Sequence, residues 1–245
     1  MIPPESNIVI LTGAGMSAES GVATFRDAGG LWEGHKIEEV ASPKGFARDP
    51  ELVHEFYNQR RAQLKAVEPN AGHEALARLE RQWSGGFLLV TQNVDDLHER
   101  AGSEYLVHMH GELLKARCED CGAVLSWSRD LASGSRCRAC ATIGSLRPHI
   151  VWFGEYPLEM DRITTALKKA DLFVCIGTSG VVYPAAGFAA QAAGNGRCRL
   201  IEVNMDRTGI SQHFHQHITG PAAVEVPKLV DAILAEASLS GLESD

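Results

Sequence analysis

The chain has 245 residues, of which 44% are hydrophobic and 22% are charged, a balance typical of a folded globular protein and not of a disordered one. Its formal net charge of -8 opposes binding to phosphate backbones, so we expect no nucleic-acid partner. No apolar run approaches the ~20 residues that cross a bilayer, so we expect no membrane partner.

The seven residues before the first strand-like run are too few for a secretory signal or a transit peptide. We therefore expect a soluble, cytoplasmic protein. The processed form of an imported precursor would look the same.

Short apolar runs alternate with helix-like stretches along the chain. The apolar runs predict strands that are buried on both faces of a parallel sheet, at residues 8–11, 87–90, 172–176 and 200–203, with a candidate fifth at 223–226. The intervening stretches predict helices at 49–66, 71–82, 159–170, 185–193 and 227–237, the last with Pro227 at its first position. This order predicts an α/β fold with a doubly wound, Rossmann-like parallel sheet.

Two segments interrupt the alternation and predict a smaller domain beside the sheet. Residues 31–84 form a helical module, and residues 113–149 form a module that carries two cysteine pairs. Residues 1–30, 85–112 and 150–245 then make up the Rossmann-like, dinucleotide-binding domain.

The first strand ends in a glycine-rich turn at residues 12–18. Gly13 permits a tight turn, and Gly15 lets backbone N–H groups approach a pyrophosphate at a helix start, although a plain strand-to-helix turn fits this motif alone about as well. The acidic residue that binds a ribose about 20 residues later in Rossmann folds has no counterpart, because residues 24–32 have the character of a loop. Asn204 and the run Gly177-Thr178-Ser179, both at strand ends, are better candidates to bind a ribose and phosphates.

Polar residues also follow the second strand. Asn93 and Asp95 place a carboxamide and a carboxylate two residues apart, a pair that can grip an amide-bearing ring and order a ribose or a water. Capping of the following helix by either residue is an equally good interpretation.

Two histidines lie two residues apart farther along the chain. In an extended run His108 and His110 point to the same side, and a histidine with a pKa near ~6.5 is suited to take a proton from a hydroxyl at neutral pH. We favour His110 as the base because Gly111 leaves its ring less crowded.

Four of the six cysteines form two C-x-x-C pairs, Cys118 with Cys121 and Cys137 with Cys140, separated by fifteen residues. This spacing predicts a zinc site. Four thiolates leave no open position for water, so the metal is expected to be structural. Cys175 and Cys198 lie in apolar runs and are interpreted as small buried hydrophobic residues.

As a set, these motifs resemble the sirtuin family. The resemblance covers nearly the whole chain, in order, and rests on residues 13–21, 24–26, 92–95, 110–111, the two cysteine pairs, 153–155, 177–179 and 203–204. It implies an NAD-dependent protein lysine deacylase with one structural Zn²⁺ in the smaller domain. In such enzymes the acyl oxygen attacks C1′ of the nicotinamide ribose, nicotinamide leaves, and a histidine activates a ribose hydroxyl so that the acyl group ends on ADP-ribose.

The resemblance also implies roles for individual residues. His110, Asn93 and Asp95 match the catalytic positions. The positions that match NAD contacts are Gly13, Ala14, Gly15, Ser17, Ala18, Glu19, Thr24, Phe25, Arg26, Trp32, Gln92, Asn93, Asp95, Gly177, Thr178, Ser179, Asn204, Met205, Asp206 and Ala222. The acyl-lysine peptide is expected to add a strand between residues 153–155 and 181–183. The expected contacts of this peptide are Val151, Phe153, Gly154, Glu155, Val181 and Tyr183. We expect the protein to be a monomer whose partners are the acylated lysines of other proteins.

The residues predicted to bind the acyl group itself are Tyr57 and Arg60, which share one helix face at spacing i, i+3. The pair resembles that of the sirtuin branch that removes succinyl, malonyl and similar acidic groups, since a guanidinium binds a carboxylate bidentately and a phenol adds a hydrogen bond. Ala28 matches the small residues that widen the acyl pocket there. We expect activity on acetyl groups as well. The alternative for this pair is that Tyr57 and Arg60 only decorate a helix surface. The alternatives for the whole protein are protein mono-ADP-ribosyl transfer and a non-catalytic NAD-binding adaptor.

Overall fold

The computed structural model describes residues 2–22, 31–32 and 34–242 of the chain. The predicted roles of Thr24, Phe25, Arg26 and Ala28 therefore lie outside the described residues. Within the described part of the chain, no helix combines the length and the apolar character needed to cross a membrane.

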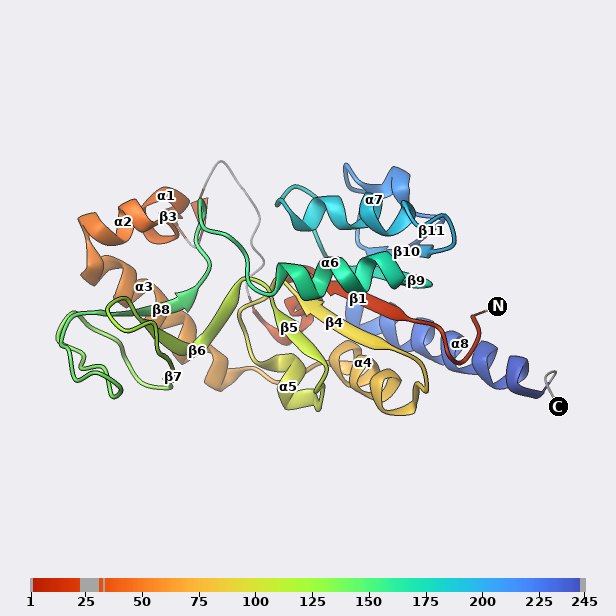
Figure 1. Ribbon diagram of the computed structural model, residues 1–245, viewed down its shortest axis with the longest axis horizontal. Coiled ribbons are helices and arrows are strands. Elements are labelled where there is room, and N and C mark those ends of the chain that lie inside the picture. Colours follow the sequence, from red (N-terminus) through yellow and green to blue (C-terminus); the bar gives the residue numbers. More distant parts are fainter. Residues whose placement is uncertain (1, 23–30, 33, 243–245) are drawn as a thin grey trace.

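A six-stranded parallel sheet forms the larger part of the molecule, with the strand order β11-β10-β9-β1-β4-β5 (Figure 1). Its strands are β1 (Ile8–Thr12), β4 (Phe87–Thr91), β5 (Leu106–His108), β9 (Leu172–Ile176), β10 (Arg199–Asn204) and β11 (Gln216–Thr219). The first strand of the chain lies at the centre, between β9 and β4. Because all six strands run the same way, their carboxyl ends meet at one edge of the sheet.

Helices cover both faces of this sheet. They are α4 (Ala71–Gln82), α6 (Met160–Lys169), α7 (Phe188–Ala193) and α8 (Ala222–Leu242). Side chains of β1 alternate between two hydrophobic clusters: Ile8 and Ile10 pack with α4 and α8, whereas Val9 and Leu11 pack with α6 and α7. Figure 1 shows the two helix pairs on opposite sides of the strands. A strand buried on both faces explains the continuous apolar run in the sequence.

The end of the sheet differs from the prediction. Residues 223–226 do not form a strand but belong to α8, and Pro227 lies inside that helix instead of at its first position. Val226, Val230 and Ile233 are buried at helical spacing, so the apolar stretch follows the helix period and not that of a strand. The strands β5 and β11 were not predicted, because they are only three and four residues long and each contains a histidine.

The smaller domain contains the helices α1 (Ile37–Val40), α2 (Pro43–Arg48) and α3 (Pro50–Gln63), a short hairpin of β2 (Leu31–Trp32) and β3 (His35–Lys36), and an antiparallel sheet in the order β7-β6-β8. The strands of that sheet are β6 (Gly111–Cys118), β7 (Val124–Ser126) and β8 (Leu146–Ile150). Asp49 caps α3 by accepting a hydrogen bond from the Leu52 amide at 3.0 Å. Phe56, Tyr57 and Trp152 lie in the core of this domain. The predicted fold class is confirmed.

Candidate active site

A cavity of about 800 Å³ opens at the carboxyl ends of β1, β4, β9 and β10 and continues toward the smaller domain, which is where open α/β sheets place their ligands. The residues predicted to bind cofactor or substrate that line it are Gly13, Ala14, Gly15, Ser17, Ala18, Glu19, Trp32, Tyr57, Gln92, Asn93, Asp95, His110, Val151, Phe153, Gly154, Glu155, Gly177, Thr178, Ser179, Val181, Tyr183, Asn204, Met205, Asp206 and Ala222. Arg60 is not among the lining residues. Trp152 also lines the cavity, between the predicted residues Val151 and Phe153, and was not predicted from the sequence.

Two glycines at the end of β1 lie against the loop that follows β9. A Cβ atom on Gly13 would lie 2.8 Å from the Gly177 carbonyl oxygen, and one on Gly15 would lie 2.7 Å from the Gly177 Cα. The Gly15 amide donates to that same carbonyl at 2.8 Å. The glycines therefore serve the packing of two backbones, which the sequence reading did not foresee. They lead into the 3₁₀ turns Ala14–Met16 and Ala18–Ser20 and not into an α-helix.

Asn93 and Asp95 meet at the hydroxyl of Ser17. The Asn93 amide donates to the Ser17 Oγ at 3.0 Å and to the Gly13 carbonyl at 3.1 Å, and the Ser17 hydroxyl donates to Asp95 Oδ2 at 3.0 Å. Burial raises the pKa of Asp95, while hydrogen bonds from the Leu97 amide and Ser17 oppose this rise. The Leu97 bond means that Asp95 also caps the start of α5 (Leu97–Ala101). The structure thus shows the contact at the helix start, and the role of this carboxylate toward a ligand stays a prediction.

A buried polar network that was not predicted from the sequence extends behind Ser17, Asn93 and Asp95. The His73 Nε2 lies 3.4 Å from the Ser17 Oγ, and the His73 ring contacts the His98 ring at 4.8 Å between centroids. The His98 Nε2 lies 3.1 Å from the Thr12 hydroxyl. Burial lowers the pKa of His73 to about 4 and, helped by the charges of nearby histidines, lowers the pKa of His98. Both rings are therefore neutral at pH 7 and act as hydrogen-bonding groups.

The two candidate bases, His108 and His110, have different surroundings. Both nitrogens of His108 face acceptors, the Asn93 carbonyl at 3.0 Å and the Glu99 carboxylate at 2.8 Å. Although burial lowers the pKa of His108, the hydrogen bond and charge of Glu99 raise it above the ordinary value overall. His108 does not line the large cavity. It is therefore a paired, structural histidine.

His110 uses only one ring nitrogen within the described part of the chain. Its Nδ1 lies 3.1 Å from the Gln92 carbonyl oxygen, and because a carbonyl can only accept, Nδ1 carries the proton. Burial lowers the pKa of His110, with the Gln92 carbonyl opposing the shift. The ring is then neutral at pH 7, and its Nε2 lone pair is available at the cavity. This is the arrangement that a general base needs.

Tyr57 and Arg60 sit on α3 as expected, but only Tyr57 reaches the cavity. The Tyr57 phenol oxygen accepts a hydrogen bond from the Trp152 indole at 3.0 Å. The Arg60 guanidinium lies over the Phe56 ring, 3.6 Å from its centroid, and donates to the Phe56 carbonyl at 2.8 Å. Arg60 is 9% exposed, one helical turn from Tyr57.

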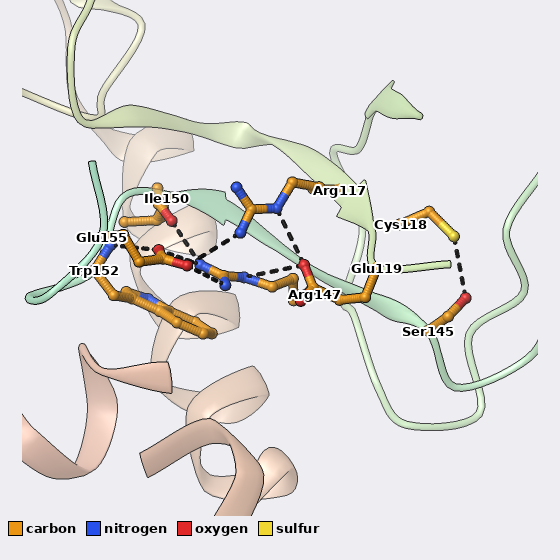
Figure 2. A network of polar contacts seen from close by, with 8 residues as sticks. All are labelled: Arg117, Cys118, Glu119, Ser145, Arg147, Ile150, Trp152 and Glu155. Atoms are coloured by element: carbon orange, nitrogen blue, oxygen red, sulfur yellow. Dashed lines mark hydrogen bonds and ion pairs between the residues drawn. The ribbon is translucent and has the colours of Figure 1, made fainter. Parts of the chain in front are cut away.

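The segment after β8 is fixed by an ion pair between buried Arg147 and half-buried Glu155 (Figure 2). Arg147 donates to the two carboxylate oxygens of Glu155 at 2.8 Å each, and its guanidinium lies 3.4 Å from the centroid of the Trp152 ring. Arg117 adds a bond to Glu155 at 3.2 Å and another to Glu119 at 3.1 Å. Glu119 follows the first cysteine of the cluster. The network therefore joins the cysteine ribbon to one wall of the cavity.

The four cysteines come together as the spacing predicts. The sulfurs of Cys118 and Cys140 lie 3.7 Å apart and those of Cys121 and Cys137 lie 3.9 Å apart, and all four sulfurs are within 4.8 Å of one another. Zinc–sulfur bonds of about 2.3 Å in a tetrahedron give sulfur–sulfur distances of about 3.8 Å. A disulfide would need about 2.05 Å. The residues therefore fit a four-thiolate zinc site.

These features define a parallel-sheet protein whose ligand cavity lies between a Rossmann-like domain and a smaller domain with a cysteine ribbon. The family model described as "Sir2 family" matches residues 13–184 of the chain. The chain therefore belongs to the Sir2, or sirtuin, family, and the resemblance drawn from its motifs is confirmed.

Relatives and solved structures resemble the chain over almost its full length. An NAD-dependent protein deacylase of Vibrio parahaemolyticus is 55% identical over 95% of this chain and 97% of its own, and one of Salmonella typhimurium is 52% identical over 93% and 84%. A structure described as a Sir2 homolog–NAD complex is 38% identical with a TM-score of 0.85, covering 96% of this chain and 91% of that chain. One described as Sir2 bound to acetylated peptide is 25% identical, with a TM-score of 0.78 and 92% of both chains covered.

Proposed function

We propose that this protein is an NAD-dependent protein lysine deacylase that removes succinyl, malonyl and acetyl groups from lysine and releases nicotinamide and O-acyl-ADP-ribose. The observation that carries the proposal is the neutral His110 ring, held through Nδ1 by the Gln92 carbonyl in a cavity that Asn93 and Asp95 also line. The names of the relatives and of the two solved structures support the cofactor and the class of substrate.

The donors and acceptors around the cavity suit a dinucleotide. Buried Asn93 and Asp95 carry polar side chains at its wall. The Gly13 and Gly15 amides donate to the Ile176 and Gly177 carbonyls, so these glycines let the two loops pack closely beside the cavity. Residues of these two loops would hold the phosphates, and Asn204 at the end of β10 would meet a ribose. When bound, NAD supplies an activated ribose carbon that can take over the acyl group.

The residues of the chain then have separate tasks. Asn93 and Asp95 orient the carboxamide and the ribose. His110 accepts a proton at Nε2 from a ribose hydroxyl, and its Nδ1 proton stays hydrogen-bonded to the Gln92 carbonyl, which stabilises the imidazolium that forms.

The acylated peptide would lie between the segments that contain Phe153 and Val181, because both line the cavity and carry exposed apolar side chains, 50% and 64% exposed. The lysine side chain would enter toward Tyr57. Arg60 lies one turn farther along α3, and its charge acts on the Tyr57 phenol. A carboxylate at the end of an acyl chain would then draw the guanidinium away from the Phe56 ring into a charge-assisted hydrogen bond.

A panel of one peptide sequence with acetyl, succinyl, malonyl and glutaryl lysine tests the proposal, with NAD present and products read by mass spectrometry. We expect O-acyl-ADP-ribose from the acidic groups and from acetyl. Label from NAD that stays on the protein would instead indicate ADP-ribosyl transfer, and NAD binding without release of nicotinamide would indicate an adaptor. His110→Tyr should abolish all turnover, and normal rates in that variant would remove His110 as the base.

Arg60→Met tests the acyl preference. It should lower desuccinylation by about 10-fold or more, the loss of one charge-assisted hydrogen bond, and should affect deacetylation far less. Lys65→Met, which removes an exposed charge just beyond the same helix, is the matched control and should change neither rate. Equal losses on both substrates would contradict the assignment of Arg60.

A further inference from the structure

Trp152 makes a hydrogen bond that can run in only one direction. Its indole Nε1 lies 3.0 Å from the Tyr57 phenol oxygen, and an indole nitrogen is a donor that cannot accept. The phenol oxygen must therefore accept this bond with a lone pair. Trp152 and Tyr57 are 2% and 0% exposed, and both line the cavity.

The proton of the Tyr57 hydroxyl is thereby left for another partner. Among the residues that the structure describes, none accepts a hydrogen bond from this hydroxyl. Burial raises the pKa of Tyr57 well above its ordinary value, with the Trp152 bond opposing the shift. The phenol therefore keeps its proton, and a buried donor without an acceptor is unfavourable unless a ligand supplies one.

Trp152 itself is held from three sides, so its N–H has a fixed direction. Its backbone amide donates to Glu155 Oε2 at 2.9 Å. The Arg147 guanidinium lies 3.4 Å from its ring centroid and the Phe46 ring lies 5.2 Å away. Figure 2 shows Trp152 below the bidentate pair of Arg147 and Glu155. Because the indole ring is fixed in this way, its N–H keeps one direction toward the Tyr57 oxygen and does not turn with the phenol hydroxyl.

We infer that Trp152 is a positioning residue for acyl selectivity: by occupying the lone pair of the Tyr57 phenol, its indole N–H directs the phenol proton to an acceptor on the acyl chain. The inference rests on the proposed function and deepens it. A succinyl or malonyl group brings a carboxylate that can accept this proton, whereas an acetyl group ends in a methyl. The indole therefore favours acidic acyl groups without touching their carboxylate.

The test compares Trp152→Phe, Tyr57→Phe and the double variant on one peptide that carries succinyl-lysine or acetyl-lysine, with kcat and KM measured separately. Trp152→Phe should lower the succinyl-to-acetyl ratio of kcat/KM by about 5-fold, the effect of a misdirected hydrogen bond to a charged group, mainly through KM for the succinyl peptide. In the Tyr57→Phe background, the same substitution should leave that ratio unchanged.

Trp127→Phe is the matched control. Trp127 is also 2% exposed, and its indole donates to the Asp130 carbonyl at 3.2 Å, but it lies in the cluster with the cysteines and does not line the cavity. This variant loses the same atoms and should leave the ratio unchanged. If Phe at position 152 prevents folding, 3-benzothienyl-alanine at that position replaces the N–H by sulfur at nearly the same ring size.

Equal losses on both peptides in the Trp152 variants, or a change of ratio that persists in the Tyr57→Phe background, would overturn the inference while the proposed function stands. A wild-type protein that does not desuccinylate would overturn both. A fall in ratio that depends on the phenol supports the inference, because lost packing alone would not distinguish the two acyl groups.

Discussion

Glu155 is expected to contribute strongly to stability because it neutralises a guanidinium that has almost no contact with water. Its carboxylate accepts four hydrogen bonds, two from Arg147, one from Arg117 and one from the Trp152 amide, and the Arg147 side chain is 2% exposed. Removing one partner of a buried pair costs about 3–5 kcal/mol. Glu155 is itself 21% exposed, so we expect about 2–3 kcal/mol for Glu155→Gln.

The effect should depend on pH in a defined direction. Burial raises the pKa of Glu155, but the hydrogen bond and charge of Arg147 outweigh it and hold the pKa below its ordinary value. The folded pKa is lowered, so the stabilisation is fully present above the unfolded pKa of about 4.3. It is lost as the pH falls through the folded value. The difference between wild type and Glu155→Gln should therefore be constant from pH 7 to pH 5 and shrink below pH 4.

Urea unfolding at several pH values measures this difference. Glu119→Gln is the control, because Glu119 is 48% exposed and contacts Arg117 at 3.1 Å and Arg147 at 3.9 Å. Such an exposed partner should contribute less than about 1 kcal/mol. The reasoning would be refuted if both variants lost the same free energy of unfolding at pH 7, or if the Glu155 effect persisted unchanged at pH 3.

Three further outcomes follow from the site. The acid limb of kcat/KM for deacylation should have its midpoint below pH 6.5, because burial lowers the pKa of His110, and a midpoint above that value would contradict the neutral base. In Gly15→Ala the added Cβ would lie 2.7 Å from the Gly177 Cα. This variant should lower the free energy of unfolding by about 1–3 kcal/mol, measured by thermal unfolding, and weaken NAD binding, measured by calorimetry. Gly134→Ala, with open space around the added Cβ, should change neither. Elemental analysis should find about one zinc per chain, lost in Cys137→Ser and kept in Cys175→Ser; zinc retained in the first variant would rule out the four-thiolate site.

The elements that the sequence predicted best carry a strong local signal. The predicted helix 71–82 coincides with α4, because Asn70 caps it, accepting from the Gly72 amide at 2.9 Å, while the His73 ring accepts from the Asn70 amide. The buried strands β1, β4 and β9 stood out as continuous apolar runs, and β10 as an apolar run interrupted by Glu202. By contrast, the valines of residues 223–226 fit either a strand or a helix, and only the burial of Val226 and Val230 at helical spacing in the folded chain decides between them.

For the site, the sequence located the polar residues at strand ends but not what holds them. The neighbouring Gly111 and the sirtuin resemblance selected His110, yet the carbonyl that sets its tautomer belongs to Gln92, just after the end of β4. Arg60 was selected from its spacing to Tyr57, but the sequence does not say that its side chain folds back on Phe56. Such contacts depend on side-chain rotamers and on segments far apart in the chain, which a single sequence does not encode in a local pattern.

The central position of β1 has a consequence for how the cavity assembles during synthesis. Ile8 pairs with Phe87 on one side and with Leu172 on the other, so the first strand made must wait for most of the chain before its second neighbour exists. The loop contact between Gly15 and Gly177 cannot form earlier. A nascent or truncated chain that ends before β9 therefore lacks one wall of the cavity, and strand pairs this far apart in the sequence form slowly.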